Sequence, residues 1–298
     1  MPRVIVVGDL VTDVLVEHDG PIRPGSDTAA AIRVSGGGQA ANTAAWLARA
    51  GQATTLVAAV GADQAGRDRV AELVAAGVGD AVRVLPGAAT GSVVVLTGAS
   101  ERTMITDRGA CLLLDPAHVT AALRAAAPGD HLHLSGYPLL HAGSRPAGLA
   151  ALAAARQQGL TVSVDAASAA PLRDAGASAF LTWVRDADLL LCNADEADVL
   201  AGPAPAAAQA TRLTATVRHA VVKQGPAGAV WATRDGSAWS APGLSVPVKD
   251  PTGAGDAFAA GLLTSWLNDG SPPAALQAGA ALGAAAVQLL GARPDPSR

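Results

Sequence analysis

Short runs of β-branched and leucine residues alternate along the chain with longer segments rich in alanine and leucine. The short runs have the length of buried strands and lie at residues 4–7, 54–60, 131–134, 160–164, 189–192 and 220–222. The longer segments have the length of helices and lie at residues 40–50, 64–76, 116–126 and 145–158. Strands that alternate with helices in this way build a sheet whose strands are mostly parallel. The pattern therefore predicts an α/β fold.

Two regions interrupt this alternation, at residues 14–34 and 82–106. Both hold short alternating segments punctuated by glycine and proline, and neither contains a pattern of helical length. We expect both to form strands of a small accessory sheet, a lid inserted into one domain that spans residues 1–298. A hairpin is also expected, because residues 228–233 and 237–240 flank the favoured turn pair Asp235-Gly236.

Composition narrows the classes of function. The chain has 298 residues, of which 50% are hydrophobic, and a formal net charge of -4. This balance indicates a folded core, and it gives no excess of positive charge for nucleic acid or for anionic membranes. The two cysteines, Cys111 and Cys192, are far apart and indicate neither a disulfide framework nor a zinc site. With no signal peptide or membrane span in the pattern, we expect a cytoplasmic protein.

The strongest chemical signal is the segment KDPTGAGD at residues 249–256, directly before an apolar helical pattern at residues 257–267. A glycine turn that opens a helix can direct the N–H groups of Gly253, Ala254 and Gly255 into one cavity, where they would hold negative charge. Asp256, expected one residue inside the helix, is placed to accept a proton from an attacking hydroxyl. The alternative is a glycine-rich loop with Asp256 as an ordinary helix-start residue.

The segment DPTGAGD resembles a motif of the ribokinase-like carbohydrate kinases, also called the phosphofructokinase-B family, and the resemblance runs over nearly the whole chain. It implies a three-layer α/β/α fold with a small β-sheet lid, and ATP as phosphoryl donor. It also implies that Asp256 is the catalytic base and that Gly253, Ala254 and Gly255 surround the transferring phosphate. Both roles agree with the interpretation from the residues themselves.

A glycine run at residues 36–38 leads into a helix that carries Asn42 in its first turn. Bare backbone permits close approach of a ligand, and an amide side chain can bond neighbouring hydroxyls, although a local backbone bond for Asn42 is equally compatible. The segment is similar to the family's GGxxxN signature, which implies sugar contacts by Gly37, Gly38 and Asn42. The resemblance likewise implies a sugar contact for Asp13, whereas Asp9 is expected to be a solvated loop carboxylate.

The remaining candidates concern the nucleotide and its ions. Residues 193–196 resemble the family's NxxE motif, which implies that Glu196 holds Mg²⁺ through water and that Asn193 faces a phosphate; the alternative is a helix cap with a capping box. Lys223, Gly225 and Gly228 resemble a nucleotide-contacting turn. Asp250 resembles a ligand of a monovalent cation such as K⁺. The roles of Asp165, Arg102 and Arg108 stay open between ligand contacts, a loop cap for Asp165 and a solvated lid edge for the two arginines.

These observations predict an ATP-dependent phosphotransferase that acts on a hydroxyl of a small sugar or sugar-derived substrate. The acceptor is open among ketohexoses, keto-deoxy sugar acids, ribose and nucleosides, so a nucleoside kinase is one alternative. A non-catalytic sugar-binding regulator is another, and the retained Asp256 argues against it. A dinucleotide-dependent oxidoreductase is disfavoured, because Val7-Gly8-Asp9 lacks the GxGxxG fingerprint. Pairing of exposed lid strands would give a homodimer.

Overall fold

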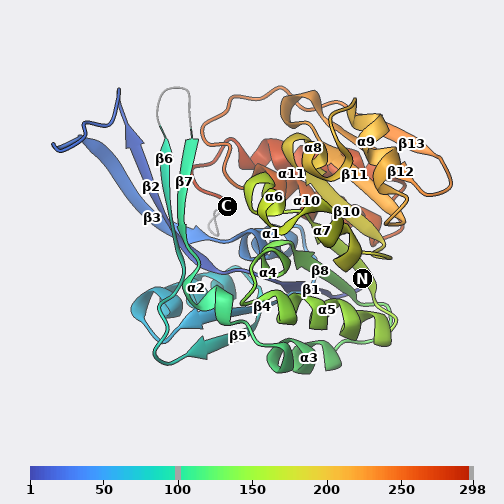
Figure 1. Ribbon diagram of the computed structural model, residues 1–298, viewed down its shortest axis with the longest axis horizontal. Helices are drawn as coiled ribbons and strands as arrows, with labels where there is room; N and C mark the ends of the chain where they lie inside the picture. The colour runs from blue at the N-terminus through green and yellow to red at the C-terminus, as the bar shows by residue number, and fades with distance from the viewer. Residues whose placement is uncertain (98–101, 295–298) are drawn as a thin grey trace.

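A large twisted sheet forms the centre of the computed structural model, which describes residues 1–97 and 102–294 (Figure 1). In this part of the chain the sheet has nine strands in the order β13-β12-β11-β10-β9-β8-β1-β4-β5. They are β1 (Val4–Val7), β4 (Thr54–Gly61), β5 (Gly79–Leu85), β8 (His131–Ser135), β9 (Thr161–Asp165), β10 (Leu189–Asn193), β11 (His219–Lys223), β12 (Ala229–Thr233) and β13 (Ala238–Ala241). Neighbours from β5 to β11 pair in parallel, and β12 and β13 add an antiparallel hairpin.

Helices cover both faces of this sheet (Figure 1). One face carries α3 (Pro116–Arg124), α4 (Tyr137–Leu140), α5 (Arg145–Gln157), α6 (Ala169–Ala175), α7 (Ala177–Trp183), α8 (Ala194–Ala201) and α9 (Ala206–Leu213). The other carries α1 (Gln39–Arg49), α2 (Gln64–Ala75), α10 (Ala254–Trp266) and α11 (Pro272–Ala286). Two short 3-10 turns lie at Gly109–Leu113 and Gly225–Ala227.

Side-chain alternation in the strands fills a separate core on each face. In β1, Ile5 and Val7 pack in the core beneath α3 and α5, whereas Val4 and Val6 pack in the core beneath α1 and α10. Successive residues of a strand point to opposite faces, so an uninterrupted apolar run such as VIVV is buried on both. The predicted three-layer α/β/α fold is confirmed.

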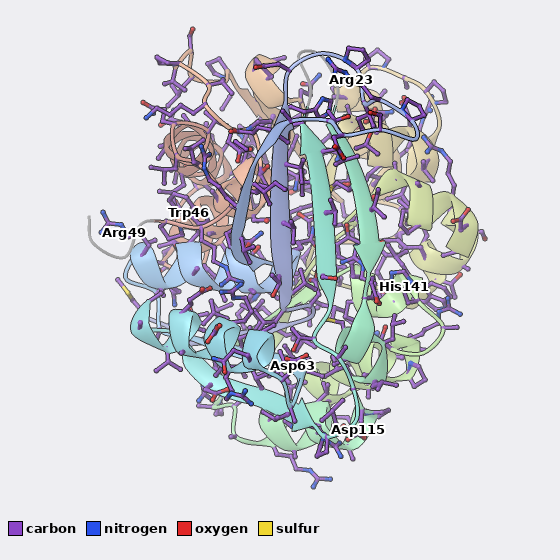
Figure 2. All side chains as sticks on the ribbon, turned by 90° about the vertical axis from the view of Figure 1, so that its left-hand side faces the viewer. Arg23, Trp46, Arg49, Asp63, Asp115 and His141 are labelled. Atoms are coloured by element: carbon purple, nitrogen blue, oxygen red, sulfur yellow. The ribbon has the colours of Figure 1, made fainter. Side chains whose placement is uncertain are left out.

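A second, four-stranded sheet extends away from the main body (Figures 1 and 2). Its strands are β2 (Val11–His18), β3 (Ala30–Gly37), β6 (Ser92–Thr97) and β7 (Arg102–Asp107), in the order β3-β2-β6-β7. Two antiparallel hairpins join through the parallel pair β2–β6. Figure 2 faces this sheet, with Arg23 in the loop at its outer end.

The structure corrects the boundaries of this lid. The first insertion was predicted at residues 14–34, but β2 already starts at Val11 and β3 runs to Gly37, so Asp13 lies in a lid strand. The second was predicted from residue 82, but β5 pairs with β4 in the main sheet, and the lid strands begin at Ser92. Residues 98–101 of the predicted insertion lie outside the described residues. The predicted hairpin around Asp235-Gly236 is confirmed by β12 and β13.

Across residues 1–97 and 102–294, none of the helices combines the length and apolar character that crossing a bilayer requires.

Candidate active site

A cleft of about 610 Å³ opens between the lid and the carboxyl ends of the central parallel strands. Ligand sites of α/β sheets lie at this end of the strands. The cleft collects most of the predicted site residues, although they are up to 243 positions apart between Asp13 and Asp256. The predicted residues that line it are Asp13, Gly38, Asn42, Asn193, Glu196, Lys223, Gly225, Gly253, Gly255 and Asp256.

A second cavity of about 420 Å³ adjoins the cleft and shares Lys223, Gly225, Pro251 and Gly255 with it. Its lining is mostly apolar and includes Leu244, Val246, Val248, Phe258 and Val287. Gly228 and Ala254, which do not line the cleft, line this cavity. An apolar slot beside a polar cleft suits a ligand with a flat ring at one end and charged groups at the other.

The Gly253 turn connects the two spaces. Gly253 caps α10 with a φ of 78°, a left-handed conformation, and a Cβ there would lie 2.4 Å from the Ala292 carbonyl oxygen. Only glycine fits such a position without strain. The helix begins at Ala254, so Asp256 is its third residue and not its second as predicted. The Ala254 N–H donates a 3.3 Å bond to the Pro251 carbonyl.

Asp256 faces the cleft and accepts a hydrogen bond of 2.9 Å from the Asn42 side-chain amide. Burial raises the pKa of Asp256 to about 7, and the neighbouring Asp165 contributes to the rise, although the Asn42 bond and Lys223 oppose it. A carboxyl group with a pKa near neutrality can exchange a proton during a reaction.

Asn42 lies in the first turn of α1. The N-terminus of this helix is capped by Asp9, which follows β1. The Asp9 carboxylate accepts the Gln39 and Ala40 N–H groups, each at 3.2 Å. Asp9 is only 2% exposed, so the predicted solvated carboxylate is wrong: the helix N-terminus and Arg108 compensate its buried charge.

Asp13 lies buried in β2, and its carboxylate packs against the backbone of Gly37 in the neighbouring strand. A Cβ on Gly37 would lie 2.1 Å from the Asp13 Oδ1 atom. Gly37 therefore makes room for Asp13 at the cleft wall, and it does not itself line the cleft.

A cluster of buried charges forms part of the cleft wall. The Lys223 ammonium lies 2.6 Å from Asp165 Oδ2, and Gln39 donates to the other carboxylate oxygen at 2.9 Å. Asp165 and Glu196 raise the pKa of Lys223 above its ordinary value against the effect of burial, so the ammonium stays charged. Asp165 is thus an ion-pair partner as well as a loop acceptor for the Ala167 N–H.

Glu196 and Asn193 form the capping box that starts α8. The Asn193 Oδ1 atom accepts the Glu196 N–H at 2.9 Å, and Glu196 accepts the Asn193 N–H at 2.8 Å. Burial raises the pKa of Glu196 to about 7, and the Asp165 charge adds to the effect. The cap and a place in the cleft wall are thus both present.

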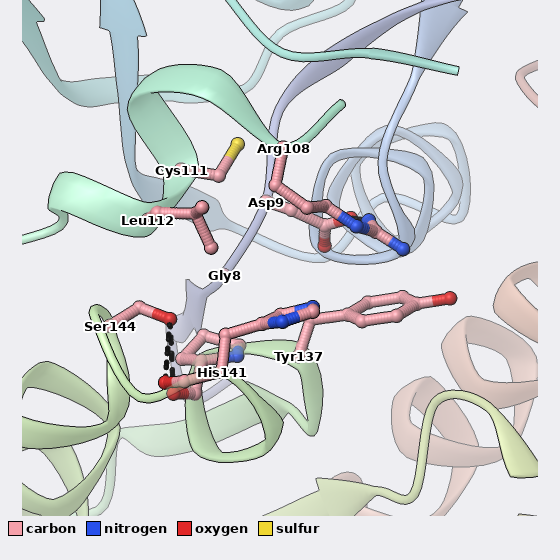
Figure 3. Close-up of a pocket in the computed structure, with 9 residues that line it drawn as sticks. Gly8, Asp9, Arg108, Cys111, Leu112, Tyr137, His141 and Ser144 are labelled. Carbon is pink, nitrogen blue, oxygen red and sulfur yellow. Dashed lines mark hydrogen bonds and ion pairs between the residues drawn. The ribbon is translucent and has the colours of Figure 1, made fainter. Parts of the chain in front are cut away.

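A solvated lid edge, one of the two alternatives for Arg108, is wrong. The side chain is 9% exposed, lies 3.2 Å from Asp9 Oδ2, and stacks on the Tyr137 ring with 3.8 Å between the guanidinium carbon and the ring centroid (Figure 3). Tyr137, the single tyrosine, lines the cleft but was not predicted, because no motif surrounds it. Gln39 was also missed as a site residue, although it belongs to the glycine-rich segment. The side chain of Arg102 lies outside the described part.

Asp250 lines neither the cleft nor the apolar cavity. Its carboxylate accepts hydrogen bonds from the backbone on either side of the Gly253 turn. Its Oδ1 atom accepts the Thr252 N–H at 2.8 Å, and its Oδ2 atom accepts the Gly291 N–H at 2.9 Å. Within the described residues, no group of three or more His, Cys, Asp or Glu side chains is arranged to hold a metal ion.

Comparison with known proteins decides the family. The family model of the pfkB carbohydrate kinases matches residues 1–298. The chain belongs to this family. Among curated relatives, an ATP-dependent ribose-1-phosphate kinase from Halopiger xanaduensis is 32% identical over 310 residues, covering 100% of this chain and 96% of the relative.

Solved structures agree with this assignment at the level of the fold. An adenosine kinase from Sinorhizobium meliloti superposes with a TM-score of 0.88 at 22% identity, covering 98% of this chain and 96% of its own. A ribokinase from Thermotoga maritima gives a TM-score of 0.81 at 21% identity, covering 100% and 97%. As a member of the pfkB family, this protein is an ATP-dependent carbohydrate kinase. The oxidoreductase and the non-catalytic regulator are set aside.

Proposed function

We propose that this pfkB kinase transfers the γ-phosphoryl group of ATP in line to a hydroxyl of a small sugar or sugar phosphate, with Asp256 as general base. The observation that carries the proposal is the Asp256 carboxylate in the cleft, bonded to Asn42 at 2.9 Å and three residues after Gly253. A pKa of about 7 leaves the group ready to take the hydroxyl proton near neutral pH. A stronger base is not needed, because the hydroxyl proton is removed late in a loose phosphoryl-transfer transition state.

The Gly253 turn supplies the positive end of the site. The N–H groups of Gly253, Ala254 and Gly255 and the start of α10 stabilise negative charge on the transferring group. Since the Ala254 N–H already has a long bond to Pro251, the two glycine amides provide most of this stabilisation. The acceptor lies at the other end of the cleft, against Asp13, Gly38 and Asn42, and Gly37 supports it from behind the Asp13 carboxylate.

The apolar cavity takes the adenine of ATP, and the shared residues Lys223 and Gly225 take its phosphates, with Gly228 at the cavity wall. The oxygen atoms of Asn193 and Glu196 are the donors that Mg²⁺ prefers, and their position in the cleft wall suits a contact through water. When bound, Mg²⁺ offsets the charge of the phosphates. Lys223 contributes a fixed ammonium, held by Asp165, to the same charge balance.

The acceptor proposed first is ribose 1-phosphate, the substrate named for the Halopiger relative. Arg108 supports an anionic acceptor, because its guanidinium is buried at the cleft wall beside Asp9. A nucleoside is the alternative. It is less well supported, since the base would need an aromatic face and Arg108 already covers one face of Tyr137.

The test is an assay of ADP release with ribose 1-phosphate, ribose, fructose, a keto-deoxy sugar acid and adenosine. We expect the highest kcat/KM with the sugar phosphate, and we expect Asp256→Asn to lower kcat by about 10²- to 10⁴-fold, the usual contribution of a general base. Asp174→Asn, at an exposed site in α6, is the matched control. Near-normal turnover by Asp256→Asn would remove the assigned base, and preference for adenosine would replace the acceptor.

Asp250 completes the proposal as a ligand of a monovalent cation such as K⁺. The Asp250 carboxylate oxygens, which accept the Thr252 and Gly291 N–H groups beside the Gly253 turn, are hard oxygen ligands of the kind that a monovalent cation prefers. Activity in KCl should then exceed activity in NaCl at equal ionic strength. Equal rates in the two salts would exclude this role.

We also propose that the protein is cytoplasmic. We further propose that it forms a homodimer through contact between two lids. The lid exposes Ile32, Val34, Met104 and Ile105, each at least 46% exposed. Contact between two lids would cover these side chains. Sedimentation that gives only monomer at micromolar concentration would contradict it.

A further inference from the structure

The chain after α11 returns beneath the active site as a strap, residues 287–293, that is held at several points. The Val287 carbonyl accepts the Lys249 N–H at 2.7 Å, and the Gly291 N–H binds Asp250. The Ala292 carbonyl accepts the Trp46 indole N–H at 3.0 Å from α1. Because Ala292 also packs against Gly253, the strap touches both the phosphate turn and the helix that carries Asn42.

The strap ends in a buried arginine that reaches the acceptor side of the cleft. The Arg293 side chain is 13% exposed. Its Nη2 atom donates to the Gly37 carbonyl at 2.8 Å, and its Nε atom donates to Asn42 Oδ1 at 3.2 Å. Its Nη1 atom lies 3.4 Å from Glu72 in α2. Gly36 leaves the space, since a Cβ there would lie 2.1 Å from Nη1.

The chemistry of these contacts fixes which way the Asn42 amide faces. A guanidinium only donates hydrogen bonds, so the amide oxygen must turn toward Arg293. The amide nitrogen then points at the Asp256 carboxylate, which only accepts when ionised. The reversed amide would set N–H groups against the guanidinium and oxygen against the carboxylate, and both contacts would repel. Burial lowers the pKa of Arg293 to about 10, so the group stays charged at neutral pH.

We propose that Arg293 is a positioning residue of this kinase, which orients Asn42 and through it the Asp256 carboxylate. The inference rests on the proposed role of Asp256 as base. The Asn42 bond favours the ionised form of Asp256 and holds one of its oxygens in place. Without Arg293 the amide can reverse, so the base both loses its alignment and becomes harder to ionise.

The test compares Arg293→Met with Glu72→Gln. We expect Arg293→Met to lower kcat by about 10- to 100-fold, the scale of a slightly misplaced catalytic group, while the KM for ATP changes little. The acid limb of its pH profile should move upward, so that the defect is larger at pH 6.5 than at pH 8.5. Glu72→Gln touches the opposite side of the guanidinium and should keep the wild-type profile. Arg293→Lys, which restores one donor, should lie between.

A double-mutant cycle separates positioning from general damage. If Arg293 acts through Asn42, Arg293→Met should add no further loss of kcat to Asn42→Ala. Losses that multiply, or an Arg293→Met enzyme with normal kcat and pH profile, would overturn the inference. If Asp256→Asn is inactive in the same assay, that result leaves the proposed base intact. If Arg293→Met is not folded, as judged by circular dichroism, Arg293→Lys carries the same comparison.

Discussion

At the scale of a single residue, burial sets the pKa of Asp256 and with it the pH range in which this group can act as a base. Its pKa of about 7 lies near the pH at which a kinase works, and the ionised form is the one that can accept a proton. We expect kcat/KM to be level above pH 7 and to fall about tenfold for each pH unit below it, since one protonation removes the base. A coupled assay from pH 5.5 to 9 measures this. A profile that stays level down to pH 5 would contradict it.

The same raised pKa makes Asp256 costly for stability. Between the ordinary carboxyl value of 3.8 and about 7, the folded state binds a proton that the unfolded state has released. Stability therefore falls as pH rises through this window, and the full cost is present at pH 8. We expect Asp256→Asn to be inactive yet more stable than wild type at pH 8, by on the order of 2 kcal/mol. Urea denaturation measures this, with Asp174→Asn as the control; equal stability at pH 8 would count against a buried, ionised carboxylate.

Residues within motifs were predictable from the sequence, and residues brought in singly by the fold were not. Asp256, Asn42 and Glu196 stand in segments whose spacing predicts that they belong to a ligand site, and all three line the cleft. Tyr137 and Arg293 have no such surroundings in the sequence. They reach the site only because β8 ends there and because the strap returns under α1.

At the scale of elements, the Gly253 turn depends on both its backbone conformation and its neighbour. Gly253 and Gly236 have positive φ values of 78° and 92°, but only at Gly253 would a Cβ meet another segment, the Ala292 carbonyl. We expect Gly236→Ala to cost about 1 kcal/mol with normal activity, through backbone strain alone. Gly253→Ala should cost more and should lower kcat strongly. Thermal unfolding and turnover measure the two effects, and equal behaviour of the two variants would show that the contact with Ala292 is unimportant.

The misplaced lid boundary has its cause in an edge strand. β5 closes the main sheet beside β4, so only part of its surface is buried, and Val84 is 53% exposed. A half-buried strand has the alternating pattern of an accessory strand. The central strands, buried on both faces, have continuous apolar runs and were therefore recognisable from sequence alone.

At the scale of the whole molecule, buried groups with opposite pH responses balance one another. Asp256 and Glu196, with pKa values of about 7, make the fold more stable as pH falls toward 5. His131 and His133 lie fully buried in β8, and burial lowers their pKa values to about 3 and about 4. Their folded forms stay neutral where the unfolded forms take up protons, so they make the fold less stable as pH falls below 6.5. The change in unfolding free energy between pH 8 and pH 5 is therefore the difference between a stabilising effect of the carboxyl groups and a destabilising effect of the histidines.

Replacing one histidine should reveal how much it contributes to the pH dependence of the unfolding free energy. His133→Gln keeps a polar group near Ser163, which lies 2.8 Å from His133 Nδ1, but it removes the titratable ring. At pH 8 the variant should be less stable than wild type, because the ring packing is lost. At pH 5 the wild type is destabilised by about 2 kcal/mol, because His133 stays neutral in the folded state. The difference in unfolding free energy between wild type and His133→Gln should therefore be smaller at pH 5 by about that amount. Ser163→Ala breaks the same bond and the 2.7 Å bond from Ser163 to His131 Nε2 without removing a titratable group, and its cost should be similar at both pH values. Urea denaturation at pH 8 and pH 5 measures both; an unchanged cost for His133→Gln would mean that this histidine is not held neutral in the fold.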